Sequence, residues 1–336
     1  MDLQGYFDQF NNKRILVIGD VMIDSYIRGK VARISPVAPV PIVSLDQRED
    51  RLGGAGNVAL NLVALGAKPI ICTVIGNDTQ SELLRSLLKD NSISGEGIIQ
   101  SSSRKTTVKT RVIGNNQQLL RVDSEQTDPI TADEENDLIN SAAALIESGV
   151  DAIIFEDYNK GILTKRVIET IVSIANKNNV ITAVDPKKDN FFAYRNVTLF
   201  KPNLKELKEG LGMSFDFNSD LLAFENAVTL LESKLENTIS FVTLSEHGVF
   251  ICNANEHHYI PAHVRTIADV SGAGDTVISV ATLCLVSGMP IKMVAEIANT
   301  LAGSYHSYDR TLLVEAGTGT GGGPASGQIG SLGSAY

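Results

Sequence analysis

Short apolar runs alternate with stretches of helical period along most of the chain. Runs rich in Val, Ile, Leu and Phe predict strands that are buried on both faces. We expect these strands at Arg14–Gly19, Pro69–Ile75, Ala152–Glu156, Val180–Val184, Val197–Phe200 and Ile239–Leu244. Amphipathic periodicity predicts helices at Asn57–Leu65, Thr79–Lys89, Ala132–Ile146, Lys165–Lys177 and Ser219–Lys234. The alternation predicts an α/β fold with a mostly parallel central sheet and helices on both faces.

Two extended regions interrupt this alternation and have no helix beside them. Val37–Leu45 is rich in proline, which sheets tolerate at their edges. Gly114-Asn115-Asn116 separates two further extended segments, Thr106–Ile113 and Gln117–Asp123, as the turn of a hairpin does. We expect a small β-layer that projects from the main sheet as a lid, within residues of about 33–45 and 104–123. A peripheral hairpin without function is the alternative.

Composition narrows the class of protein. The chain has 336 residues, of which 43% are hydrophobic and 20% charged, and its formal net charge is −10. The acidic balance argues against a general surface for nucleic acid. The sequence has neither an apolar run of the roughly 18 residues that span a membrane nor a recognisable signal peptide. Cys72, Cys252 and Cys284 lack the spacing of a zinc or disulfide framework, so we expect a cytoplasmic protein without membrane or nucleic-acid partners.

The domain organisation follows from one change of composition. Residues 1–316 are expected to form a single domain. Residues 317–336 are rich in Gly and Ser and nearly uncharged, which is typical of a disordered linker or tag.

The strongest local signal for chemistry is DVSGAGDT at residues 269–276, which leads into an apolar helical stretch. Small residues let a phosphate approach the backbone, and the amides at a helix start attract anions. Asp275 would repel that phosphate unless the carboxylate takes a proton from an attacking hydroxyl. An anion site beside a base is what phosphoryl transfer needs. A helix with an acidic first turn is the alternative.

A second glycine-rich turn, GGAGN, occupies residues 53–57. It suits the close approach of a polyhydroxylated ligand, with Asn57 as amide donor and acceptor. Gly54–Ala59 also matches G-x-G-x-x-A, with Asp78 beyond it, which is a weak dinucleotide fingerprint. The fingerprint does not follow a clean strand, and a simple tight turn also explains it.

Polar side chains follow the ends of several predicted strands. Ligands of open α/β sheets bind at the carboxyl ends of the strands, so these positions are candidates. Asn203 and Glu206 also have the spacing of a helix capping box. The positions are Asp20, Asp24, Glu156–Lys160, Asp185–Lys188, Lys201–Asn203 with Glu206, and Thr243–Gly248.

The combination of motifs resembles the ribokinase (PfkB-type) carbohydrate kinases. The residues that carry the resemblance are GGAGN at 53–57, NLKE at 203–206 and DVSGAGD at 269–275. Within that family, the blocks at 19–29, 33–41 and 106–123 are similar to heptose 7-phosphate kinases, which occur alone or as the first domain of a bifunctional protein. The resemblance covers roughly residues 13–303 and implies a ribokinase-like fold.

The resemblance also implies roles for individual residues. Asp275 would be the base for the sugar's anomeric hydroxyl, and the amides of Gly272, Ala273 and Gly274 would hold the transferring phosphoryl group. The sugar phosphate would be bound by Asp24, Gly53, Gly54, Asn57, Arg111, Lys160 and Lys187, with Arg104, Lys105 and Lys109 as further candidates for its phosphate. The nucleotide would be bound by Asn203, Glu206, Thr243, Ser245, Gly248, Asp269 and Asn299. Glu206 would hold Mg²⁺ through water.

The implied activity is ATP- and Mg²⁺-dependent phosphorylation of D-glycero-D-manno-heptose 7-phosphate to the 1,7-bisphosphate, a step toward ADP-heptose and the lipopolysaccharide core. A monovalent cation is left open, and the lid implies a homodimer. The alternatives are another sugar or nucleoside kinase of this family, a nucleotide-dependent oxidoreductase, and an inactive sugar-binding protein. Two departures from the family pattern stand out: Val37 replaces a usually acidic residue, and the pattern is not recognisable after Gly303.

Overall fold

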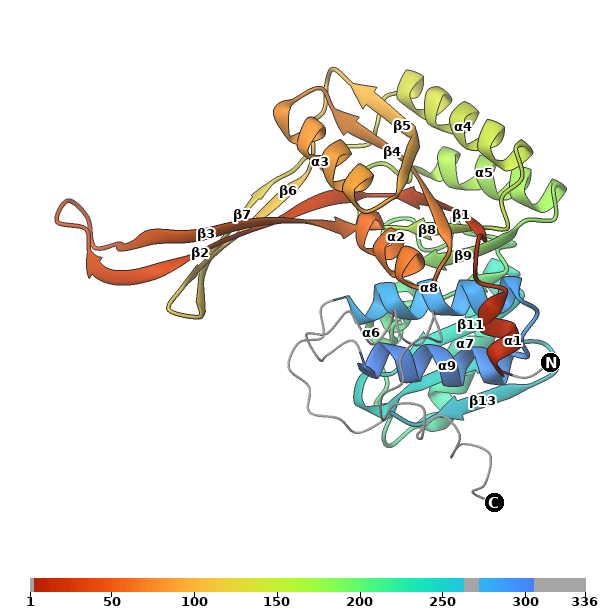
Figure 1. The fold of residues 1–336 in the computed structure, drawn as a ribbon. Helices are drawn as coiled ribbons and strands as arrows, with labels where there is room; N and C mark the ends of the chain where they lie inside the picture. The colour runs from red at the N-terminus through yellow and green to blue at the C-terminus, as the bar shows by residue number, and fades with distance from the viewer. Residues whose placement is uncertain (1–2, 263–271, 305–336) are drawn as a thin grey trace.

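The computed structural model describes residues 3–262 and 272–304, and its centre is a nine-stranded sheet (Figure 1). The strand order is β13-β12-β11-β10-β9-β8-β1-β4-β5, and neighbours are parallel from β11 to β5. The predicted mostly parallel sheet is therefore confirmed. The strands are β1 (Arg14–Gly19), β4 (Lys68–Gly76), β5 (Ser94–Ser101), β8 (Ala152–Glu156), β9 (Ile181–Asp185), β10 (Leu199–Phe200), β11 (Ile239–Thr243), β12 (Val249–Cys252) and β13 (His257–Ile260).

The helices are distributed over the two faces of this sheet (Figure 1). They are α1 (Leu3–Asp8), α2 (Ala55–Ala64), α3 (Thr79–Asp90), α4 (Ala132–Glu147), α5 (Lys165–Lys177), α6 (Leu204–Leu211), α7 (Leu221–Leu235), α8 (Ala273–Val286) and α9 (Ile291–Ser304). Among the described residues, no helix has the length and apolar character needed to cross a membrane.

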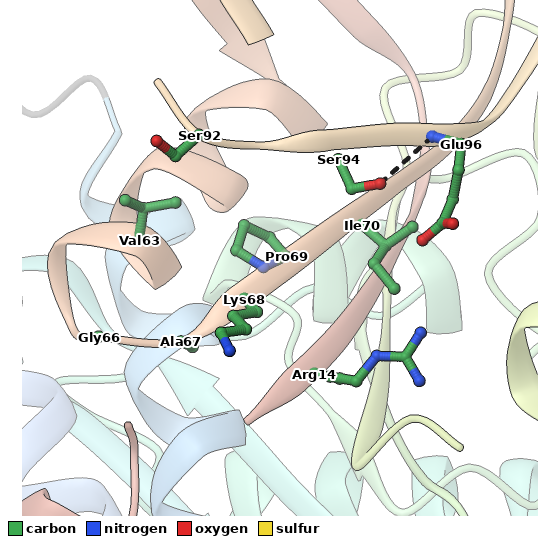
Figure 2. Close-up of a pocket in the computed structure, with 10 residues that line it drawn as sticks. All are labelled: Arg14, Val63, Gly66, Ala67, Lys68, Pro69, Ile70, Ser92, Ser94 and Glu96. Carbon is green, nitrogen blue, oxygen red and sulfur yellow. Dashed lines mark hydrogen bonds between the residues drawn. The ribbon is translucent and has the colours of Figure 1, made fainter. Parts of the chain in front are cut away.

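An open pocket of about 460 Å³ lies at the amino ends of β1, β4 and β5 (Figure 2). Arg14 and Glu96 are among its lining residues. The Arg14 guanidinium donates hydrogen bonds to the carbonyls of Ser148 and Gly149, the two residues that follow α4. The pocket contains none of the candidate residues from the sequence, because those follow the opposite, carboxyl ends of the strands.

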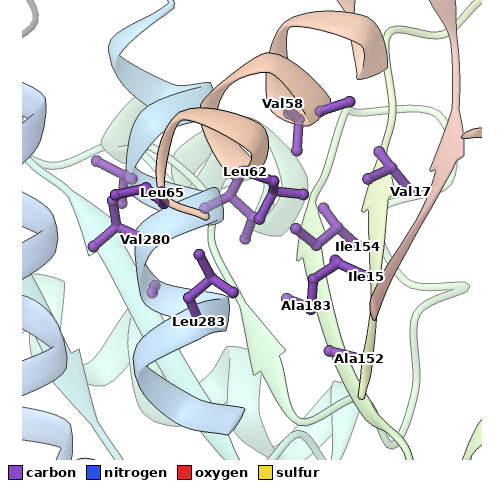
Figure 3. Close-up of a cluster of buried hydrophobic side chains, with 14 of the residues drawn as sticks. Ile15, Val17, Val58, Leu62, Leu65, Ala152, Ile154, Ala183, Val280 and Leu283 are labelled. Atoms are coloured by element: carbon purple, nitrogen blue, oxygen red, sulfur yellow. The ribbon is translucent and has the colours of Figure 1, made fainter. Parts of the chain in front are cut away.

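Each central strand is buried on both faces, and successive side chains enter two different cores. Ile15 and Val17 of β1 pack with α2 and α8 in one cluster, where Figure 3 shows them near Leu62. Leu16 and Ile18 point the other way and pack in the cluster of α4, α5 and α7. Because a buried side chain of this size stabilises the fold by about 1.5–3 kcal/mol, both faces need apolar residues. This explains why the strands are continuous apolar runs.

The second sheet contains four strands and extends away from the main sheet as a long projection (Figure 1). Its order is β3-β2-β6-β7, with β2 (Val21–Ile34), β3 (Pro41–Gly54), β6 (Val108–Gly114) and β7 (Gln117–Ser124). The predicted small β-layer is thus present, and we call it the lid sheet. The strands β2 and β6 are parallel, and the other two pairs are antiparallel.

The structure corrects the predicted extent of the lid. The predicted extended segment Val37–Leu45 contains bends at 36–39, and β3 begins only at Pro41. The strand β2 was not predicted, because its alternation of polar and apolar residues lacks a continuous apolar run. The segment predicted as a strand at Val197–Phe200 contributes only Leu199 and Phe200 to the sheet. The tail at 317–336 lies outside the described residues.

Candidate active site

Three neighbouring parallel strands end at one place and carry acidic residues there. The register aligns Gly19 of β1 with Glu156 of β8, and Glu156 with Asp185 of β9. Chain connections leave β1 toward β4 on one side, while β8 lies on its other side. This reversal of strand order is where open α/β sheets bind ligands. The carboxyl edge beside β1 is therefore the candidate site.

Asp275 lies at this edge, in the first turn of α8. Gly272 precedes the helix with a φ of 89°, which glycine adopts without steric cost. The Asp275 side chain is 6% exposed and accepts a hydrogen bond from Asn57 Nδ2 at 2.6 Å. The Tyr158 hydroxyl donates to its other oxygen at 3.3 Å. Segments that are far apart in sequence thus converge on one carboxylate.

Burial raises the pKa of Asp275 to about 6, although the hydrogen bond from Asn57 opposes the shift. A carboxylate with this pKa is ionised at neutral pH and is a better proton acceptor than an ordinary aspartate. This matches the requirement for a general base.

The amides before Asp275 lie beside the ion pair of Asp185 and Lys201. Among the described residues, the Ala273 and Gly274 amides have no recorded acceptor, as expected for the first turn of a helix. A Cβ added to Gly274 would lie 3.5 Å from Asp185 Oδ2 and 3.6 Å from Lys201 Nζ. The start of the helix is therefore bordered by its first-turn amides, an ammonium group and a carboxylate, and the amides and the ammonium group suit a phosphate.

Three buried carboxylates and two lysines form the floor of the site. One oxygen each from Glu156, Asp185 and Asp275 lies within 4.8 Å of the others. Lys201 Nζ pairs with Asp185 at 2.8 Å. Lys187 Nζ contacts Glu206 at 2.6 Å and Asp185 at 3.7 Å. The lysines offset part of the negative charge of the cluster.

Glu156 is a buried carboxylate of this cluster with a strongly raised pKa. Burial raises its pKa well above the usual value, and the charges of Asp185 and Asp275 raise it further. Its Oε2 atom is buried and has no hydrogen-bond partner among the described residues. An orphaned carboxylate oxygen beside two others fits a hard cation such as Mg²⁺, which prefers oxygen ligands.

The sugar side of the site joins the lid sheet to α2. Asp24 Oδ2 occupies the space where a Cβ at Gly53 would lie, and Gly54 has a φ of 58°. Asp24 is ion-paired with Arg111 of β6. Three steps after Gly54, α2 presents Asn57 to Asp275. The fold therefore connects the predicted sugar residues Asp24, Gly53, Gly54, Asn57 and Arg111 to the base.

The dinucleotide fingerprint finds no support in this arrangement. The helix α2 follows β3 of the lid sheet rather than a strand of the parallel sheet. Asp78 caps α3 by accepting from the Ser81 amide at 2.8 Å, and it accepts from the Thr106 amide at 2.9 Å. Its carboxylate is thus used within the fold.

Several of the predicted phosphate-binding cations have partners within the fold, Arg111 through Asp24 among them. Lys160 pairs with Glu125 at 2.7 Å. Arg104 donates to the main-chain oxygens of Gln126, Asp128 and Lys160. Lys187 lies at the carboxylate cluster, with its ammonium 5.6 Å from the Tyr158 ring, and not beside Asp24 or Arg111.

The predicted nucleotide residues fall into two groups. Asn203 and Glu206 form a reciprocal capping box on α6. The backbone of Asn203 also forms an isolated parallel β-bridge with Thr243 at the end of β11. Ser245 and Gly248 bound the turn into β12. Asn299 of α9 donates to the Pro261 carbonyl, and the backbone of Pro261 lies against Gly248. Asp269 lies outside the described residues.

Four residues of the site were candidates by their position in the sequence but were given no role there: Glu156, Tyr158, Asp185 and Lys201. Each follows or ends a predicted strand, so its position was a usable signal. Only the register of the sheet shows that they meet Asp275.

Comparisons with known proteins agree with this arrangement. Residues 12–306 match the family described as pfkB family carbohydrate kinase. The "Bifunctional protein HldE" of Helicobacter acinonychis (strain Sheeba) is 39% identical over 290 residues, which are 86% of this chain. The chain spans 62% of the length of that relative.

Two solved structures are similar in fold. The tetrameric inhibited form of phosphofructokinase-2 from Escherichia coli gives a TM-score of 0.73 at 19% identity, covering 91% of this chain and 98% of the other. Arabidopsis thaliana ribokinase complexed with ribose and ATP gives 0.66 at 14% identity, covering 91% and 99%. The predicted ribokinase-like fold is confirmed.

Proposed function

The chain belongs to the pfkB family of carbohydrate kinases, and from this premise we propose that it phosphorylates the anomeric hydroxyl of D-glycero-D-manno-heptose 7-phosphate. The observation that carries the proposal is a buried carboxylate, Asp275, in the same helix turn as amides that have no acceptor among the described residues. The similarity to HldE relatives supports the heptose substrate. ATP would be the donor, and the product would be the 1,7-bisphosphate, a precursor for ADP-heptose and the lipopolysaccharide core.

The mechanism follows from the positions of the groups. The sugar hydroxyl oxygen attacks the γ-phosphorus of ATP, the bond to the β-phosphate oxygen breaks, and ADP leaves. Asp275 accepts the hydroxyl proton, while Asn57 and Tyr158 keep its carboxylate oriented. The Gly272, Ala273 and Gly274 amides, with Lys201 nearby, stabilise the charge on the transferring group.

The donor set at the cluster fits Mg²⁺. Glu156 and Asp185 would hold the ion directly or through water, and Glu206 keeps its predicted role through water while it caps α6. When bound, Mg²⁺ neutralises charge on the phosphates. ATP and a sugar phosphate are cytoplasmic metabolites, so we place the reaction in the cytoplasm. Activation by a monovalent cation stays an open prediction. Comparing the activity in a potassium salt with the activity in the salt of a large organic cation would test it.

A substrate panel tests the proposed activity. We expect the protein to convert heptose 7-phosphate and ATP into a doubly phosphorylated heptose, detected by mass spectrometry, with kcat/KM above that for unphosphorylated sugars, hexose phosphates and nucleosides. A preference for a free sugar or a nucleoside would favour the second candidate, another kinase of this family. If no acceptor in the panel receives phosphate from ATP, the alternative of an inactive sugar-binding protein would be favoured.

We also propose that the lid sheet forms a homodimer interface. Side chains of a strand alternate between faces, and the face opposite Asp24 carries a row of apolar side chains beside polar ones such as Arg48 and Asp50. The register places Ile27 of β2, Val112 of β6 and Leu120 of β7 side by side on it. Leu120 is 56% exposed and Val122 is 50% exposed. A second copy of the same sheet would cover this face and so remove apolar side chains from water.

Charged residues on this face should dissociate the dimer. We expect the double substitution Leu120→Glu and Val122→Glu to convert dimer into monomer at micromolar concentration, measured by analytical ultracentrifugation. Leu222→Glu, at a residue that is 67% exposed on α7, is the matched control and should not change the oligomeric state. A wild-type monomer, or a dimer that tolerates both glutamates, would contradict the proposal.

A further inference from the structure

Two side chains that hydrogen-bond Asp275 come from segments that both contact Asp20, the residue directly after β1. Asn57 lies in the first turn of α2, and Tyr158 lies in the loop after β8. The Asp20 carbonyl accepts from the amide of Ala55, the first residue of α2, at 3.0 Å. The Asp20 carboxylate accepts from the Tyr158 amide at 2.8 Å. Asp20 therefore connects the two segments that orient the base.

The loop after β8 takes its shape from carboxylates. The amides of Tyr158 and Lys160 both donate to Asp20 Oδ2, at 2.8 and 3.1 Å. The Asn159 amide between them donates to Asp157 Oδ1 at 2.8 Å. Asn159 has a φ of 53°, in the left-handed region that residues other than glycine seldom adopt. Three successive amides of this turn are thus held by two side chains.

Both of these carboxylates are buried, with Asp20 2% exposed and Asp157 1% exposed. Burial raises the pKa of Asp20, and the hydrogen bonds from the amides of Tyr158 and Lys160 lower it. A buried carboxylate needs such hydrogen bonds to offset its lost hydration. The carboxylate and the loop amides therefore fix one another's positions.

The position of the loop matters because the Tyr158 hydroxyl reaches the base. Burial and the negative charge of Asp275 raise the pKa of this hydroxyl, so it stays protonated and acts as a donor. Its contact with Asp275 Oδ1 measures 3.3 Å. The usual O–H···O distance is about 2.7–2.8 Å, so a small displacement of the loop would break this hydrogen bond.

The far end of the loop has an anchor that does not involve Asp20. Arg104 donates to the Lys160 carbonyl and to the Asp128 carbonyl. The Gly161 carbonyl accepts from the Ile130 amide at 3.0 Å. Loss of the Asp20 carboxylate should therefore displace Tyr158 without unfolding the whole loop.

We infer that Asp20 is a positioning residue for phosphoryl transfer: its carboxylate holds the loop at 157–160 so that the Tyr158 hydroxyl reaches Asp275. The inference rests on the proposed function in one respect, which is that Asp275 is the base. Asp20 acts through the loop and does not bind the substrate, although its place at a strand end made it a candidate for ligand binding.

A double-mutant cycle tests this role, with the acceptor that the wild type prefers in the substrate panel. Asp20→Ala removes the acceptor of both amides and keeps the backbone contact with α2. It should lower kcat about 10–100-fold, as the loss of a hydrogen bond to a charged group does, and Tyr158→Phe should lower kcat by a similar factor. In the Tyr158→Phe background, Asp20→Ala should lower kcat less than about threefold, because the hydroxyl that it positions is already absent.

The conservative variant Asp20→Asn should restore most of the activity. Both amides donate to the same oxygen, and Asp20 Oδ1 has no hydrogen-bond partner among the described residues. The single carbonyl oxygen of asparagine has two lone pairs and can accept both amides, so kcat should lie within about threefold of the wild-type value. A role through charge alone would leave this variant as impaired as Asp20→Ala.

Asp151→Ala is the matched control. Asp151 accepts the Arg14 amide at 2.8 Å, at the amino ends of β1 and β8, so it holds the opposite ends of the same two strands. Its replacement should leave kcat unchanged. Hydrogen exchange of the peptide 157–161, measured by mass spectrometry, reports on the loop without requiring activity. Exchange should be about 10–100-fold faster in Asp20→Ala and unchanged in Asp20→Asn and Asp151→Ala.

The other outcomes overturn the inference. These are an unchanged kcat in Asp20→Ala, a loss that persists in the Tyr158→Phe background, and an inactive Asp20→Asn. An Asp20→Ala protein that does not fold, as judged by circular dichroism, would assign the carboxylate to stability and also contradict the inference. Failure of the proposed function looks different: the wild type would phosphorylate no sugar, but exchange of the loop would still be faster in Asp20→Ala and not in Asp20→Asn.

Discussion

Replacing Asp275 by asparagine is expected to lower kcat by about 10²–10⁴-fold, the usual contribution of a positioned general base. The amide is nearly isosteric and can still contact Asn57 and Tyr158, so the fold and the anion site should persist. ATP affinity is expected to stay within a few-fold of the wild type, because the Ala273 and Gly274 amides and Lys201 are unchanged. Steady-state kinetics and equilibrium nucleotide binding measure the two effects separately.

Asp78→Asn is the matched control for this experiment. Asparagine caps a helix as well as aspartate does, so the α3 cap should survive, although the Thr106 amide loses its acceptor; turnover should stay near the wild-type value because Asp78 lies outside the carboxylate cluster. Wild-type turnover in Asp275→Asn would reject the assignment of the base. Loss of activity in Asp78→Asn alone would instead revive the dinucleotide fingerprint.

The pH profile gives an independent check on Asp275. Its carboxylate must be ionised to accept a proton, and burial raises its pKa to about 6, so kcat/KM should fall as the pH drops through about 6. Tyr158→Phe removes a hydrogen bond that favours the ionised form and should move this acidic limb to higher pH. An acidic limb that stays in place would show that Tyr158 does not act on the base.

Replacing Lys201 by methionine should produce the largest loss of stability, about 3–5 kcal/mol in the free energy of unfolding at neutral pH. The Lys201 side chain is 3% exposed and pairs with Asp185, whose side chain is 8% exposed. Without the ammonium, Asp185, Glu156 and Asp275 are left as a buried acidic cluster, and among the described residues Lys187 is the cation that still pairs with it. Denaturant unfolding followed by circular dichroism measures the difference.

The loss of unfolding free energy in Lys201→Met should become smaller in acid. The folded state binds a proton at Asp275 as the pH falls through about 6, whereas the unfolded chain binds it only near the usual aspartate pKa of 3.8. Acid in this pH range therefore favours the folded state. Protonation removes the charge that Lys201 would otherwise compensate. Lys205→Met, at an 81% exposed side chain 3.8 Å from Glu209, is the control and should change stability by less than about 0.5 kcal/mol. Equal losses in both variants would contradict the assignment of a buried ion pair.

The central sheet was predictable because its strands are buried on both faces. The predicted bounds of β1, β8 and α5 agree with the structure residue by residue. The lid sheet was harder to predict, since one of its faces is polar and its strands alternate. The strand β2 therefore resembled a loop in the sequence, although its Asp24 is ion-paired with Arg111 of β6.

Local motifs likewise predicted only part of the site. Asp275 and the glycines before it form one continuous motif, and a helix start attracts anions whatever surrounds it. Glu156, Asp185 and Lys201 each follow an ordinary apolar strand. Nothing local indicates that two of these carboxylates lie within 4.8 Å of Asp275, or that the ammonium pairs with one of them.

The sequence by itself determined the alternation of strands and helices and the glycine-rich turns, because backbone conformation and burial depend on neighbouring residues, and it made Asp275 the candidate base. The tertiary structure decided which cations are free to meet a ligand. Lys160 and Arg104 were candidates for phosphate binding in the sequence, but packing gives Lys160 an ion pair with Glu125 and engages Arg104 with main-chain oxygens. Charge is a property of a residue, whereas compensation of that charge is a property of the fold.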